Sequence, residues 1–103
     1  MPYIAQEGRH DLDDLIDPLV NKLVEKYTTA TKIVGPLNYV LSRIFLGTLT
    51  KLTKLHPEEK GYGTLAAFGG VLSHMGMEIY RRVTVSYEEN KIMDNGDLPE
   101  MSE

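Results

Sequence analysis

The sequence predicts an all-α protein: a single helical domain, residues 1–103, with three main helices at about 11–28, 36–55 and 64–93, forming an oligomeric bundle. Two patterns carry this prediction. Apolar residues recur every three to four positions across the first two segments, which is the period of an amphipathic helix. The third segment opens within seventeen residues, Gly61 to Met77, that contain no formal charge. The length and the 42% hydrophobic composition suit one domain with a modest core.

The first predicted helix has an apolar stripe with a period near 3.6. The stripe consists of Leu12, Leu15, Ile16, Leu19, Val20, Leu23, Val24 and Tyr27. Asp11 is the expected N-cap residue, because its carboxylate can accept a hydrogen bond from the first helical turn. Pro18 interrupts the pattern, so the helix is expected to kink there or to restart with Asp17 as N-cap. The polar, β-branched run Thr28 to Lys32 is expected to be a connection.

The second predicted helix opens with Pro36 at the first helical position, where its missing N–H costs no hydrogen bond. Its buried stripe is expected to be Leu37, Val40, Leu41, Ile44, Phe45, Leu49 and Leu52. His56 and Pro57 end this helix, and the glycine-containing segment 57–63 is expected to be a loop.

The third predicted helix begins with Thr64 as N-cap and carries two different stripes. The large apolar stripe is Leu65, Phe68, Leu72, Met75 and Ile79. The small stripe, which is the predicted interface, is Ala66, Gly69, Gly70, Ser73 and Gly76. Each glycine inside a helix costs about 1 kcal/mol relative to alanine, so close approach of another helix is the expected gain. Because the first half of this helix is apolar nearly all round, self-association into a homo-oligomer is expected to cover it.

The end of the third helix shows two further signals. Val83 to Val85 are poor helix formers and predict a kink or a short extended piece. Asn95 and Gly96 predict the helix end, because glycine suits the left-handed position after the last turn. Residues 1–9 and 97–103 are expected to be extended or frayed ends.

Charge is unevenly distributed, although the formal net charge is only −4. Residues 1–17 carry a net −4, residues 18–87 carry +5 and residues 88–103 carry −5. Either the acidic ends maintain solubility, or the basic middle meets an anion while the ends limit nucleic-acid binding. No helix shows a basic recognition face, so nucleic acid is not an expected partner.

The sequence also bears on the compartment. It has no cysteine, so it holds no disulfide framework and no thiolate site. The N-terminus is too polar for a signal peptide, and Gly61 to Met77 contains too many glycine and polar residues for a membrane span. The expected location is cytoplasmic, without a membrane partner.

Two clusters of tyrosine and arginine supply the candidate ligand-binding residues: Tyr39, Arg43, Tyr80, Arg81 and Arg82. Arginine binds carboxylate or phosphate through its planar fork and stacks on aromatic rings. The clusters could therefore line a pocket for a small anionic, nucleotide-like ligand.

The same residues also have a structural interpretation. Glu78 can neutralise Arg82 four residues later on one helix. Arg43 can pair with an acid from a neighbouring helix or subunit. If the first interpretation holds, Arg81 is the expected anion contact.

Metal binding and catalysis have less support. His74 and Glu78 have the i,i+4 spacing of helical metal ligands, but no second acid–histidine pair exists and His10 and His56 fall in or near loops. No nucleophile–base motif, phosphate loop or paired carboxylate in an apolar setting is present. No metal, no cofactor and no enzyme activity are expected.

The opening PYI, the segment GPLNYVLSRIF and the segment MEIYRRVTVSYEENKIMDNGD resemble, in that order, a family of short uncharacterised proteins from bacteria, archaea and bacteriophages. The matching positions, spread over most of the chain, are Pro2, Tyr3, Ile4, Asn38, Tyr39, Arg43, Tyr80, Arg81, Arg82, Tyr87, Glu88, Lys91, Asn95, Gly96 and Asp97. The chain departs by having Ile79 for an aromatic residue, Ser86 for a proline, and LSHMGM where the family tends to a Glu-x-x-Lys element. The resemblance implies a helical domain without an assigned activity, and its phage members imply a small host-directed binding protein.

The expected function is therefore capture of a small anionic ligand, such as a nucleotide signal of host defence, by a non-enzymatic homo-oligomer. The alternative is a protein-interaction or structural oligomer without a small-molecule ligand, in which the same residues serve the subunit interface.

Overall fold

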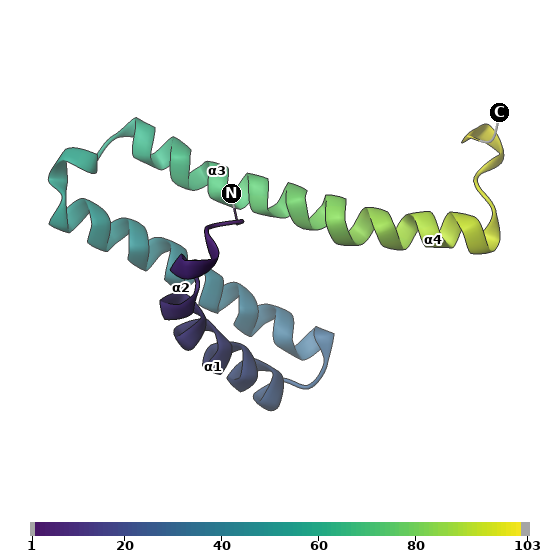
Figure 1. The fold of residues 1–103 in the computed structure, drawn as a ribbon, viewed down its shortest axis with the longest axis horizontal. Helices are drawn as coiled ribbons and strands as arrows, with labels where there is room; N and C mark the ends of the chain where they lie inside the picture. The colour runs from purple at the N-terminus through teal and green to yellow at the C-terminus, as the bar shows by residue number, and fades with distance from the viewer. Residues whose placement is uncertain (1, 102–103) are drawn as a thin grey trace. The chain divides into compact units, whose positions relative to one another are not determined.

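A computed structural model describes residues 2–101, and within that range the chain is helical without any strand (Figure 1). The helices are α1 (His10–Lys26), α2 (Ala30–Leu55), α3 (Tyr62–Ile79) and α4 (Val85–Asn95). Short turns of 3₁₀-helix are η1 (Gln6–Gly8), η2 (Pro57–Glu59) and η4 (Pro99–Met101), and η3 (Tyr80–Thr84) is a π-helical turn. The predicted all-α class is confirmed, and so are three main helices, because α3, η3 and α4 follow one another without a break.

The chain divides into two units, Tyr3–Thr64 and the part from Leu65 onward, and each is described by itself. A single domain and an oligomeric assembly both stay predictions.

The first unit begins with α1, which starts one residue before the expected N-cap. Arg9, not Asp11, is the N-cap residue, and its Nε donates a hydrogen bond to the Ile4 carbonyl at 3.0 Å. Pro18 lies inside an uninterrupted helix, so the expected restart at Asp17 does not occur. The carbonyl four residues earlier loses its partner, but it belongs to an exposed turn where water can replace the bond.

α2 starts six residues before its predicted first residue. Thr29 has extended backbone angles, and its Oγ1 accepts a hydrogen bond from the Lys32 N–H at 3.3 Å, which caps a helix starting at Ala30. The prediction that Thr28 to Lys32 form a connection is therefore wrong for its second half. Pro36 lies inside the helix instead of opening it.

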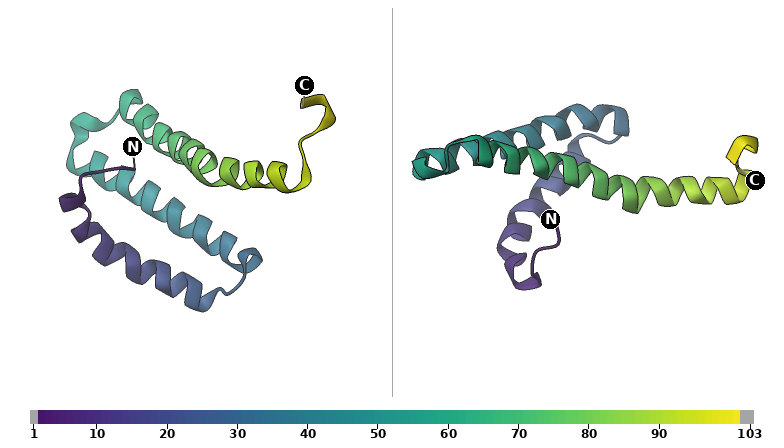
Figure 2. Two further views of the ribbon diagram at one scale, coloured as in Figure 1. Left: turned by 45° about the vertical axis from the view of Figure 1, so that its right-hand side comes forward. Right: turned by 90° about the horizontal axis from the view of Figure 1, so that it is seen from above.

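α1 and α2 form a helical hairpin, in which the chain doubles back after Tyr27 (Figures 1 and 2). The half-buried side chains nearest the connection are Leu23, Tyr27, Ile33, Pro36 and Val40. After α2, the Thr64 hydroxyl donates to the Glu59 carbonyl, and α3 starts at Tyr62. Thr64 is therefore not the N-cap that was predicted.

The main element of the second unit is one continuous helix, which runs from α3 through η3 to α4. Its irregularity lies at Tyr80–Thr84, where the Val85 N–H bonds the Tyr80 carbonyl five residues earlier. The weak helix formers at 83–85 thus mark a π-helical turn and not an extended piece. α4 ends at Asn95, and Gly96 has a positive φ of 86°, as the sequence predicts, although its ψ of 153° lies outside the left-handed helical region.

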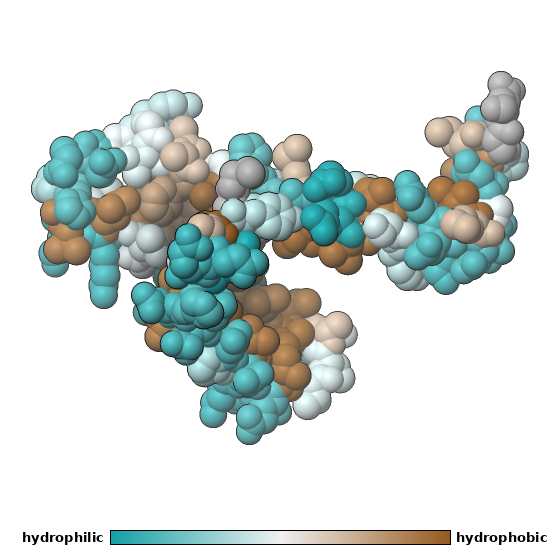
Figure 3. All heavy atoms as spheres, viewed as in Figure 1, coloured by the Kyte–Doolittle hydropathy of each residue, from teal (hydrophilic) through white to brown (hydrophobic). Residues whose placement is uncertain are grey.

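No residue from 2 to 101 is fully buried. Large apolar side chains remain exposed on both units, and Figure 3 shows hydrophobic residues open to solvent among hydrophilic ones. None of the helices in the described part combines the length and apolar character of a bilayer-spanning segment.

Candidate functional site

The first tyrosine–arginine cluster forms a direct contact on α2. Arg43 Nη1 donates to the Tyr39 hydroxyl at 3.1 Å, and the guanidinium carbon lies 5.9 Å from the ring centroid. The four-residue spacing that drew attention to this pair therefore does bring the two side chains together. The bond engages one of the five N–H donors of the guanidinium.

The second cluster lies where α3 passes into η3. Arg81 donates from Nε and Nη2 to the same Glu78 carboxylate oxygen, at 2.9 and 2.6 Å. Contrary to the expectation from the sequence, Glu78 therefore does not leave Arg81 unpaired, because the structure closes the i,i+3 pair with Arg81. Neutralisation of Arg82 by Glu78 stays a prediction. Residues three and four positions after Glu78 both lie on the same side of the helix as Glu78. Arg81 reaches the carboxylate with two donors of its planar guanidinium group. An anion at Arg81 would compete with this carboxylate.

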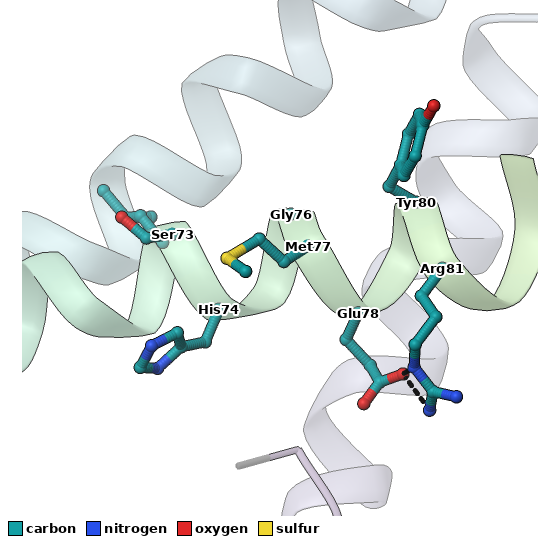
Figure 4. A pocket seen from close by; sticks show the side chains of 8 residues that line it. Ser73, His74, Gly76, Met77, Glu78, Tyr80 and Arg81 are labelled. Atoms are coloured by element: carbon teal, nitrogen blue, oxygen red, sulfur yellow. Dashed lines mark hydrogen bonds and ion pairs between the residues drawn. The ribbon is translucent and has the colours of Figure 1, made fainter. Parts of the chain in front are cut away.

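An open hollow of about 810 Å³ lies along the same stretch of helix. It is lined by Leu72, Ser73, His74, Gly76, Met77, Glu78, Tyr80 and Arg81. Figure 4 shows Ser73 and Tyr80 on one side of the helix and His74, Glu78 and Arg81 on the other. The hollow combines residues predicted for ligand binding with residues predicted for the interface, so both hypotheses point to one surface.

The small stripe of α3 has open space above two of its glycines. A Cβ built on Gly69 or Gly76 would meet no described atom within 4 Å, whereas one on Gly70 would touch the His74 ring at 4.0 Å. Packing within the chain therefore gives no reason for glycine at 69 and 76. Their role in an interface stays a prediction.

The five predicted ligand residues belong to different units: Tyr39 and Arg43 to the first, and Tyr80 to Arg82 to the second. A pocket that uses all five stays a prediction.

The first unit contains a groove that the sequence analysis missed. It has a volume of about 510 Å³ and lies between the last turns of α1 and the first turns of α2. Its lining residues are Leu19, Lys22, Leu23, Lys26, Tyr27, Gly35, Pro36, Tyr39 and Val40. Lys26 Nζ lies 5.5 Å from the centroid of the Tyr27 ring. The missed signal was the i,i+4 lysine pair beside the apolar stripe of the first helix.

The described residues place no three histidine or acidic side chains together as a metal-binding group. The expectation that the protein needs neither a metal nor a cofactor stays a prediction.

Comparison with known proteins gives one match. A family model described as "Domain of unknown function (DUF6899)" matches residues 1–98, and the chain therefore belongs to that family. This confirms the predicted membership of an uncharacterised family. No curated protein and no solved structure matches the chain.

Proposed function

We propose that this member of a family of unknown function is a non-enzymatic binding protein that works as a homo-oligomer and captures a small anionic, nucleotide-like ligand. The observation that carries the proposal is the combination, in the first unit, of arginine, lysine and tyrosine side chains around one groove. Arg43 holds the Tyr39 hydroxyl at 3.1 Å, and Lys22 and Lys26 line the same groove as Tyr39.

Self-assembly is supported by the surface that the chain exposes. Large apolar side chains are exposed in each unit, for example Leu15 at 74% in the first unit and Val83 at 62% in the second. Exposed apolar patches of several hundred Å² mark interaction surfaces in soluble proteins. These side chains are therefore available for an interface with a second copy.

α3 is the proposed assembly surface. Its residues up to Met77 carry no formal charge, and large side chains such as Leu65 and Met77 are 57% and 66% exposed. Because exposed apolar area of this extent is unfavourable in water, a second copy that covers it contributes about 25 cal/mol per Å².

The second candidate function is a protein-interaction or structural oligomer without a small ligand. It is favoured by the Glu78–Arg81 pair, because an arginine already held by a carboxylate suits an interface better than an anion site. In that case Tyr80 and the arginines at 81 and 82 belong to the subunit contact.

Thermal unfolding of the full chain, with and without a nucleotide mixture, distinguishes the two functions. A ligand present at 100 times its Kd stabilises the folded state by about 2.7 kcal/mol, so capture predicts a raised Tm. An unchanged Tm with every nucleotide would leave only the second candidate.

Light scattering tests the assembly separately. A solution mass of at least twice 11.6 kDa is expected at micromolar concentration. A monomer would contradict both functions as proposed.

A further inference from the structure

We propose that the groove between α1 and α2 is the ligand site, and that it takes a phosphorylated aromatic compound. The phosphate would contact Lys22 and Lys26, and the aromatic ring would lie against Tyr39. This inference rests on the proposed capture function and specifies where the ligand binds and which chemistry it has.

The phosphate end of the groove is supplied by one face of α1. Lys22 and Lys26 are one helical turn apart, so they project from the same side of the helix, and both line the groove. Two ammonium groups offer six N–H donors, and lysine binds phosphate as a compact charge. Lys26 lies 5.5 Å from the Tyr27 ring centroid, next to the half-buried end of the groove.

The aromatic end of the groove is supplied by α2. Tyr39 is 62% exposed and lines the groove, so a ring face is available for stacking. Arg43 donates to the Tyr39 hydroxyl and thereby fixes the ring and adds a third positive charge beside the groove. Apolar walls from Leu19, Leu23 and Val40 complete the site. The volume of about 510 Å³ falls in the usual range of small-molecule sites, about 300–1,000 Å³.

Charge distinguishes this groove from the hollow on α3. The residues that line the groove include two lysines and no acid, whereas the hollow contains Glu78 hydrogen-bonded to Arg81. An anion entering the groove meets uncompensated positive charge from its lining residues. An anion entering the hollow must displace a carboxylate.

Calorimetric titration of the full chain with three probes tests the inference: ADP, which has a ring and phosphates, pyrophosphate, and adenosine. ADP should bind more tightly than either fragment. Lys22→Gln and Lys26→Gln should each weaken ADP binding about tenfold, the usual scale for a lost charged hydrogen bond. Tyr39→Ala should weaken ADP binding and leave pyrophosphate binding unchanged. Lys54→Gln, an exposed lysine of α2 outside the groove, is the matched control and should bind like the parent.

The outcomes separate the site from the function. If ADP binds and Arg81→Gln abolishes binding while the Lys22 and Lys26 variants bind normally, the groove is wrong and capture stands. If ADP binds no more tightly than pyrophosphate, the aromatic half of the site is overturned. If the parent binds none of the probes, the groove as a site for a phosphorylated aromatic compound is overturned, and melting with the nucleotide mixture decides the capture function separately.

Discussion

The two units of the chain differ in what their apolar side chains contact. In Tyr3–Thr64, α1 and α2 form a hairpin, and side chains such as Leu23 and Val40 are half-buried beside its connection. From Leu65 onward, the described residues form one long helix followed by a short 3₁₀ turn, so α3 has no second long helix within its own unit. The second unit is nevertheless the one with the longest uncharged segment.

From this difference we expect the two units to depend on the proposed second copy to different degrees. A hairpin with half-buried contacts gains some packing free energy from its own chain. A single helix with an uncharged, glycine-bearing surface gains little, because most helical stability in proteins comes from tertiary packing. The following four predictions test this comparison, from the largest expected effect to the smallest.

Gly76→Leu has the largest expected effect, and whether it stabilises or destabilises the protein depends on whether a second helix packs on α3. If a second helix packs on α3, the added side chain overpacks the contact and destabilises the assembly by about 1–3 kcal/mol. On an uncovered helix, where no described atom lies within 4 Å, the same change would stabilise by roughly 1 kcal/mol through helix propensity. Tm and light-scattering mass measure the sign, and Gly47→Leu in α2 is the control, since its position is equally open.

Leu23→Ala should destabilise the first unit by about 1–2 kcal/mol, less than for a fully buried leucine, because the side chain is half-buried. Met77→Ala, at a position 66% exposed, sharpens the comparison. If a second copy covers α3 in the assembly, the loss of unfolding free energy caused by Met77→Ala should approach that caused by Leu23→Ala. Denaturant unfolding of both variants provides the two free energies, and a negligible cost at Met77 would argue against coverage.

Thr29→Ala should cost about 1 kcal/mol, the usual scale for a lost N-cap, because the hydroxyl accepts the Lys32 N–H. This change affects how α2 starts and should leave the oligomer mass unaltered. Circular dichroism melting measures the cost. Thr29→Ser, which keeps the hydroxyl, is the control and should melt at the same temperature as the parent.

Glu78→Gln should have the smallest effect on stability, about 0.5 kcal/mol, since Arg81 is 66% exposed and exposed ion pairs contribute little. The cost should shrink further at high salt. A cost of several kcal/mol, insensitive to salt, would show instead that the pair is enclosed by a partner subunit.

The sequence predicted the helical class and the long third helix because their signals are long and periodic. It failed at Pro36, which was predicted to open a helix, and at the restart considered beside Pro18. Exposed turns tolerate the missing hydrogen bond, and the cap at Thr29 decides where α2 begins. Val83 to Val85 signalled an irregularity correctly, but propensity cannot distinguish a kink from a π-helical turn.

The candidate site was predictable only where its residues share one helix. Tyr39 and Arg43 are one turn apart, and their contact follows from that spacing. Glu78 had two arginines within reach, and spacing alone could not predict that Arg81 donates two hydrogen bonds to it. Lys22 and Lys26 can be identified as groove residues only when α2 is seen to fold back beside them, which requires the tertiary structure.

The π-helical turn at Tyr80–Thr84 also has a consequence for how the chain tolerates changes in length. A π-helical turn holds one residue more than the corresponding α-helical path, and each residue of an α-helix turns it by about 100°. Because the extra residue is taken up within the turn, removing one residue there would restore a regular helix and leave the side chains of α4 at nearly the same angle relative to α3. The turn thus buffers the chain against a change in length, whereas deleting one residue from the regular part of α3 would rotate the surface of α4 by about 100° relative to the residues before the deletion.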